Sequence, residues 1–222
     1  MGLFIGPILF FILTTIGMYL YPGGYVIDDI LFRSHYYKFS KNFFSDLGLL
    51  ITPTGKSNIA SSILFCIGMT VVGLAFIFHA VTLKSYFPNN SKSQKLSIIA
   101  MIAGLISALG FIGVAFTPWD VFPDLHNISV LVGFGISSVY SFFFGLAVFK
   151  EKSYPNFYGV LSFGYNLAMI AYMLTTLFSP PFNTFPGLTT HVLAQKVVGY
   201  IIMILLPTQA VGSLIQIHRK RE

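Results

Sequence analysis

The stretch NIASSILFCIGMTVVGLAFIFHAVTL, residues 58–83, decides the fold class. It contains no Asp, Glu, Lys or Arg along its whole length, and about 20 apolar residues in a helix are enough to cross the hydrocarbon core of a bilayer. Lipid offers the backbone no hydrogen-bond partners, whereas a helix pairs its own N–H and C=O groups. The stretch is therefore predicted to be a membrane-spanning helix.

Five further stretches have the same character, at residues 3–20, 96–117, 128–149, 157–178 and 190–217. Across the 222 residues, 55% are hydrophobic and 9% are charged, whereas ordinary soluble domains carry roughly 25% charged residues. Little sequence is left between the spans. We therefore expect one all-α integral membrane domain over residues 1–222, a bundle of six transmembrane helices.

The distribution of Lys and Arg predicts the orientation of this bundle, because these residues favour the cytoplasmic ends of spans. One set of loops and termini carries eight of them: Lys84, Lys92, Lys95, Lys150, Lys152, Arg219, Lys220 and Arg221. The other set carries five: Arg33, Lys38, Lys41, Lys56 and Lys196. We therefore expect a cell-membrane protein with both termini cytoplasmic. The formal charge of +6 is spread over membrane-flanking loops, which favours a membrane surface over nucleic acid as partner.

Most acids and imidazoles fall in the loops predicted to face outward: Asp28, Asp29, His35, Asp46, Asp120, Asp124, His126 and His191. Carboxylates and imidazoles are the usual general acids, general bases and metal ligands. Any chemistry is therefore expected at the outer face. The positive-inside rule leaves acids unconstrained, which explains the aspartates without a function but explains the histidines less well.

The first outward loop, residues 21–57, is too long for a simple connection. Its large apolar residues recur at spacings of three and four: Phe32, Tyr36, Phe39, Phe43, Leu47 and Leu50. This period predicts an amphipathic helix lying in the headgroup plane. Asp46 falls at the edge of the apolar stripe, where a half-desolvated carboxylate needs a cation or hydrogen-bond donors. In the other two outward loops, Pro123 and Pro186 suit the first turn of a helix.

The candidate site residues are Asp46, His126 and His191, one from each outward loop, together with Ser45 and Asp124. On the last helix, the spacing of four places His191, Gln195 and Gly199 on one face, so His191 can point toward Asp46 and His126. The alternative for His191 is an interfacial imidazole bonded to water or to a lipid headgroup.

Strong catalytic motifs are missing from the sequence. It has no His-Glu-x-x-His and no Gly-x-Ser-x-Gly, and Gly55-Lys56-Ser57 is not a phosphate-binding loop because Leu50 stands where that motif needs glycine. No charged residue lies near the middle of a span, where coupled transporters usually place one. Transport is therefore the least favoured class.

Several short motifs resemble one known family. They are Gly6-Pro7 in the first span, Tyr21-Pro22-Gly23 at its end, Ser45-Asp46-Leu47-Gly48 in the first outward loop, Asn58 at the start of the second span, and the Asp-rich turn before His126. With them the chain resembles the domain of unknown function 998 family of small polytopic membrane proteins. The Ser-Asp pair is also similar to that of the Frag1, DRAM and Sfk1 group. The resemblance implies a fold and a topology, and no reaction.

Two functions stay open from the sequence. The first is a protein without catalytic activity or cofactor, which binds lipid at the outer leaflet or serves as an accessory subunit of a membrane complex. The second is a metal-dependent hydrolase acting on a lipid at the outer face, with Asp46, His126 and His191 as zinc ligands and Ser45 or Asp124 orienting the water or the substrate. Three protein ligands and an open position are what catalytic zinc requires.

Overall fold

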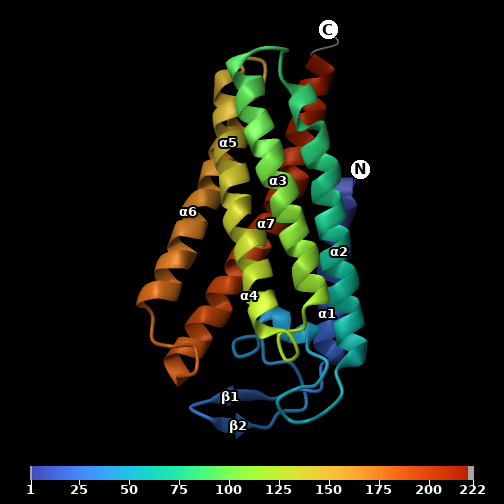
Figure 1. Cartoon of the computed structure of the whole chain (residues 1–222), viewed down its shortest axis with the longest axis vertical. Coiled ribbons are helices and arrows are strands. Elements are labelled where there is room, and N and C mark those ends of the chain that lie inside the picture. Colours follow the sequence, from blue (N-terminus) through green and yellow to red (C-terminus); the bar gives the residue numbers. More distant parts are fainter. Residues whose placement is uncertain (1, 220–222) are drawn as a thin grey trace.

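The structure, a computed structural model, describes residues 2–219 as a bundle of helices that run along one long axis (Figure 1). The α-helices are α1 (Gly2–Leu20), α2 (Ile59–Thr82), α3 (Lys92–Phe116), α4 (Pro123–Val130), α5 (Ile136–Lys150), α6 (Asn156–Phe178) and α7 (Phe185–Arg219). The shorter elements are strands β1 (Tyr25–Ile27) and β2 (Ile30–Phe32), 3-10 helices η1 (Phe44–Gly48) and η2 (Leu83–Tyr86), and the π-helix η3 (Leu131–Gly135).

Five helical segments are long and apolar enough to cross a membrane: Ile59–Tyr86, Lys92–Phe116, Pro123–Lys150, Asn156–Phe178 and Phe185–Arg219. A shorter apolar helix covers Phe4–Leu20. These lengths and compositions confirm the prediction of an all-α membrane bundle. As the prolines predicted, α4 begins at Pro123 and α7 has Pro186 as its second residue. The last helix begins at Phe185 and not at residue 190 as expected.

The helices close into a ring. In order, α1 packs on α2, α2 on α3, α3 on α5, α5 on α6 and α6 on α7, and α7 packs back on α1. The short helix α4 packs on α3, and its backbone packing on α6 or α7 is at most marginal in the described residues. A ring of this kind has an interior that side chains from several helices must fill.

The tightest helix crossing joins α3 to the π-helix η3. A Cβ atom added to Gly110 would lie 2.3 Å from the backbone nitrogen of Gly133, so only glycine allows this approach. Ser107 donates a hydrogen bond to the carbonyl oxygen of Gly133 at 2.6 Å. Small residues and interhelical hydrogen bonds of this kind are what hold helices together in a membrane.

The connections at residues 21–58, 117–122 and 179–184 gather at one end of the bundle, here called the loop end (Figure 1). Strands β1 and β2 form an antiparallel hairpin in which Tyr25 and Phe32 are paired and their rings stack at 5.2 Å. Its turn residues Asp28 and Asp29 have φ angles of 49° and 60°. The hairpin is tied to the last connection, since the Asp28 amide donates to the carbonyl oxygen of Asn183 at 2.7 Å.

The amphipathic helix expected from Phe32 to Leu50 is not present, and only η1 is helical in that region. The reason is that polar side chains bind the backbone in a non-helical path. Ser34 Oγ accepts from the Gly24 amide at 2.9 Å and donates to the Tyr36 carbonyl oxygen at 2.8 Å. The Asn42 side chain accepts from the Lys38 amide and donates to the Gly24 carbonyl oxygen, both at 2.9 Å. The helix that the apolar period predicts for this loop is therefore wrong.

Candidate functional site

Asp46 is the centre of a buried polar cluster at the loop end. Its side chain is only 6% exposed. One carboxylate oxygen accepts from the Phe43 amide at 2.9 Å and from Asn42 Nδ2 at 3.1 Å, and the other accepts from Trp119 Nε1 at 3.1 Å. Burial raises the pKa of Asp46 from 3.8 to about 6, although these three donors and the nearby Lys196 act to lower it.

Lys196 of α7 is buried in the same cluster, at 1% exposure. Its Nζ donates to the carbonyl oxygen of Asn42. It also lies over three aromatic rings, with distances from Nζ to the ring centroids of 5.2 Å for Tyr37, 4.9 Å for Phe39 and 5.4 Å for Phe44. Aromatic faces attract a cation most strongly where water is excluded. The three rings therefore stabilise the buried ammonium group of Lys196.

Two tyrosines complete the cluster. Tyr37 donates to the carbonyl oxygens of Asn42 and Phe43 at 2.8 Å, and its ring meets that of Tyr21 edge-on at 5.6 Å. Burial, together with the charge of Asp46, raises the pKa of both phenols above the usual range. Both hydroxyls therefore stay neutral. The Tyr21 hydroxyl is buried and has no hydrogen-bond partner among the described residues.

The first two connections of the loop end are joined at and beside this cluster, and α7 is joined to the first of them. Asp120 Oδ2 accepts from the backbone amides of Leu50 and Ile51 at 3.1 and 3.0 Å. With Trp119 bound to Asp46, neighbouring residues of the second connection hold the first connection at two places. The third link comes from α7, where Gln195 Oε1 accepts from the Phe44 amide at 3.0 Å. The loop end is thus one connected layer.

Beneath this layer, inside the ring of helices, lies an apolar hollow. Its lining comes from η1, α1, α2, α3, α4, η3 and α7: Phe10, Phe44, Ser45, Phe65, Met69, Phe111, Val114, Val130, Phe134, Gln195, Gly199 and Met203. The empty space between these side chains, open solvent included, is about 470 Å³, so the enclosed part is much smaller. Ser45 and Gln195 supply its polar side chains, so its chemistry is that of a site for an apolar ligand.

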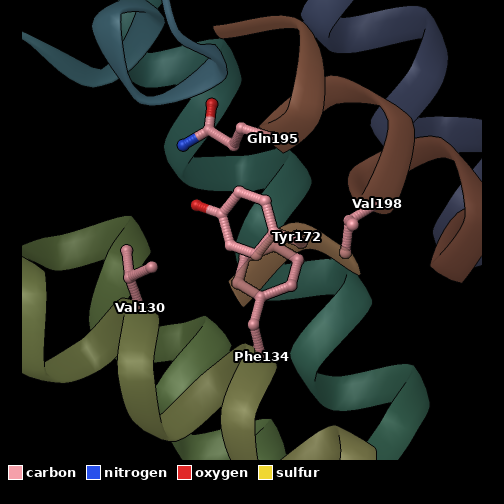
Figure 2. Close-up of a pocket in the computed structure, with 5 residues that line it drawn as sticks. All are labelled: Val130, Phe134, Tyr172, Gln195 and Val198. Atoms are coloured by element: carbon pink, nitrogen blue, oxygen red, sulfur yellow. The ribbon is translucent and has the colours of Figure 1, made fainter. Parts of the chain in front are cut away.

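A smaller pocket continues the hollow toward α6. It shares Val130, Phe134 and Gln195 with the hollow, and adds Val198 and Tyr172. Figure 2 shows these five side chains around one space, to which α4, η3, α6 and α7 contribute. The backbones of α4 and α6 make few or no close contacts with each other beside this pocket.

The structure does not bring the three predicted zinc ligands together. His126 is buried on α4, where Nδ1 donates to the carbonyl oxygen of Thr117 at 2.7 Å. His191 Nε2 donates to the carbonyl oxygen of Pro180 at 3.1 Å. Over residues 2–219, no three side chains of His, Cys, Asp or Glu are grouped so that they could hold a metal ion. The zinc-dependent hydrolase stays a prediction that this geometry does not support.

The two remaining candidates have different surroundings. Asp124 is exposed in the first turn of α4. Ser45 is half-buried, precedes Asp46 in η1 and faces the hollow. Of the candidate residues, Asp46 and Ser45 therefore lie next to each other at the boundary between the polar cluster and the hollow, while Asp124 lies outside both.

Sequence reasoning missed Lys196, Asn42 and Trp119 as parts of the site. From the sequence, Lys196 is counted among the charges of the outward loops, and no role in a site is predicted for Trp119. One signal was available for Lys196, because it follows the buried residues Leu188 and Val192 of α7 at spacings of eight and four. The partners of Asn42 lie in irregular backbone, which carries no periodic signal.

Comparison with known proteins adds no relative to this geometry, since no family model, no curated protein and no solved structure matches the chain. The resemblance to the domain of unknown function 998 family stays a prediction.

Proposed function

We propose that the protein crosses the cell membrane six times and binds a membrane lipid in the apolar hollow beneath its loop end. The observation that carries this proposal is the hollow itself, whose lining combines phenylalanine, methionine and valine side chains with two polar groups at the end nearest Asp46. Empty space of this kind inside a bundle forfeits packing contacts. An acyl chain or another apolar group would restore them.

The apolar helix Phe4–Leu20, taken together with the five longer segments, supports the six-span arrangement. The end of the bundle opposite the loop end carries the excess of Lys and Arg, which favours the cytoplasmic side. With six spans, the loop end then faces outward and both termini face the cytoplasm. The hollow then lies at the level of the outer leaflet. A lipid of that leaflet could reach it without crossing the membrane.

The path from the leaflet into the hollow is proposed to run between α4 and α6. Of the five long segments, α6 is the least buried, at 17% of its most apolar window against 39–50% for the others. Its large side chains near the loop end face outward, including Leu177 at 71% and Phe178 at 80% exposure. Beside them the small pocket lined by Tyr172 leads to the hollow.

Filling the hollow tests the proposal. Gly199 lines the hollow, and a Cβ atom there meets only the Phe44 ring at 3.4 Å, an ordinary contact. Gly199→Leu should therefore fold and occupy the ligand space. Gly164→Leu is the matched control, because Gly164 is exposed on α6 and a Cβ atom there meets nothing within 4 Å.

The measurement is mass spectrometry of lipids that remain with the protein after extraction in native membrane discs and exchange into detergent. The wild type and Gly164→Leu should retain a defined lipid. Gly199→Leu should retain about tenfold less of it, which corresponds to about 1.4 kcal/mol of binding free energy. Equal retention by all three proteins contradicts the proposal. Companion proteins recovered in place of lipid would instead support the accessory-subunit alternative.

A further inference from the structure

We infer that the ligand of the hollow is an uncharged lipid with a carbonyl or hydroxyl oxygen at its polar end, and not a phospholipid. The inference rests on the proposed function and names the chemical class of its ligand. It is carried by two observations. Two hydrogen-bond donors line the hollow without partners among the described residues, and the nearby charged side chains of Asp46 and Lys196 are already bound by protein groups.

The first donor is the side-chain amide of Gln195. Its oxygen is fixed by the hydrogen bond from the Phe44 amide at 3.0 Å. With Oε1 held in this way, the orientation of the amide nitrogen Nε2 is also fixed. Nε2 makes no hydrogen bond to any described residue. Gln195 lines both the hollow and the side pocket. Nε2 can therefore donate to an oxygen atom of a ligand in either space.

The second donor is the hydroxyl of Ser45, which also lines the hollow. Ser45 Oγ has no hydrogen-bond partner in the part of the chain that the structure describes. A hydroxyl and an amide N–H are neutral donors, and both bind a carbonyl or hydroxyl oxygen well. Both side chains are half-buried, and a ligand oxygen that accepts from both would add two hydrogen bonds that no described residue supplies.

The lining of the hollow carries no charge in the described residues. Lys196, on the same helix as Gln195, donates to the Asn42 carbonyl oxygen. Its Nζ also lies over an aromatic cage formed by the rings of Tyr37, Phe39 and Phe44. Asp46, next to Ser45, already has three donors. A phosphate drawn into this space would lose its hydration without meeting a cation, and burying an unpaired charge is far more costly than burying a carbonyl.

The phenylalanine-rich lining agrees with the same class. Rings from five phenylalanines and the thioethers of two methionines face the hollow: Phe10, Phe44, Phe65, Phe111, Phe134, Met69 and Met203. Methionine fills irregular space adaptably and contacts aromatic groups favourably. Such a lining accepts acyl or isoprenoid chains without selecting a charged headgroup, so the selection falls to Gln195 and Ser45.

A matched pair of short-chain lipids tests the inference. Dioctanoylglycerol and dioctanoylphosphatidylglycerol have the same acyl chains, and only the second carries a phosphate. Native mass spectrometry of delipidated protein titrated with each lipid should show at least tenfold tighter binding of dioctanoylglycerol. Tighter or equal binding of the phosphate-bearing lipid overturns the inference and leaves the proposed function standing. Binding of neither lipid overturns both.

Two variants make the test specific to the donors. Gln195→Glu keeps the acceptor for the Phe44 amide and replaces the free donor by an oxygen, so it should weaken dioctanoylglycerol binding about tenfold. Ser45→Ala should weaken it severalfold with little change of volume. Gln94→Glu, the same substitution near the opposite end of the bundle, should leave binding unchanged. Wild-type affinity in both donor variants, with helical content retained, overturns the inference.

Discussion

Asp46 and Lys196 are joined through a single residue that lies between them. Lys196 Nζ donates to the backbone carbonyl oxygen of Asn42, and Asn42 Nδ2 donates to Asp46 Oδ2 at 3.1 Å. Asp46 belongs to the first connection of the loop end and Lys196 to α7, so this chain of hydrogen bonds ties distant parts of the sequence together. Both side chains are buried, which makes their charges dependent on each other and on pH.

Protonation of Asp46 should be visible in the fluorescence of Trp119, the only tryptophan of the chain. The indole N–H donates directly to the Asp46 carboxylate at 3.1 Å. Because the pKa of Asp46 is raised to about 6, Trp119 emission should change with a midpoint near pH 6. Asp46→Asn should abolish the transition. A transition that persists unchanged in this variant would show that another group causes it.

The stability of the fold should fall as pH rises from about 4 to about 6. In this window the folded protein binds a proton at Asp46 that the unfolded chain, with a pKa near 3.8, has released. Two pKa units correspond to about 3 kcal/mol. Thermal unfolding in detergent over this pH range measures the effect, and Asp46→Asn should flatten it. A stability that rises through the window in the wild type but not in Asp46→Asn would contradict the assignment.

Lys196→Met should move the Trp119 transition to higher pH. Burial raises the pKa of Asp46, and the ammonium of Lys196 lowers it. Removing this charge should therefore raise the pKa of Asp46 further. Methionine retains most of the length of the side chain within the cage of Tyr37, Phe39 and Phe44. The same titration measures the midpoint. Lys56→Met, at an exposed loop position, is the control and should leave it near pH 6.

The helices could be predicted from the sequence because each has a long apolar run with a clear physical cause. Their ends were less certain, and α7 begins before residue 190 because Pro186 in its first turn extends the helix into polar sequence. The first connection could not be predicted. Its apolar period resembled a helix, but Ser34 and Asn42 bind its backbone in another path.

The site was predictable only where a residue had a local signal. Asp46 stood at the edge of an apolar stripe, and Gln195 and Gly199 shared a helix face. The hollow was not foreseen, because its lining comes from seven elements whose mutual placement no local pattern encodes. The aromatic cage of Lys196 depends on the same long-range placement.

Gly110→Ala should destabilise the bundle by about 1–3 kcal/mol, the usual cost of overpacking. The added Cβ atom would lie 2.3 Å from the Gly133 nitrogen, and backbone cannot move aside as a flexible side chain can. The thermal unfolding midpoint of the purified protein measures the loss. Gly164→Ala, which adds the same atom in open space on α6, should have an unchanged or slightly higher midpoint. Equal effects of the two substitutions would contradict the close crossing of α3 and η3.

Replacing Asp28-Asp29 by Asn-Gly should stabilise the β1–β2 hairpin. Both aspartates have positive φ angles, a conformation that costs most residues energy and that Asn-Gly adopts readily in two-residue hairpin turns. The expected gain is a few tenths of a kcal/mol, up to about 1 kcal/mol, because relief of the positive-φ cost is partly offset by the greater freedom of glycine in the unfolded chain. The hydrogen bond from the residue 28 amide to the Asn183 carbonyl oxygen is retained, since it uses the backbone.

Limited proteolysis at the turn measures the effect, and cleavage should slow. Asp28→Val with Asp29→Val is the opposing control, because β-branched residues disfavour positive φ, and it should be cleaved faster. Faster cleavage of the Asn-Gly variant would contradict the turn geometry.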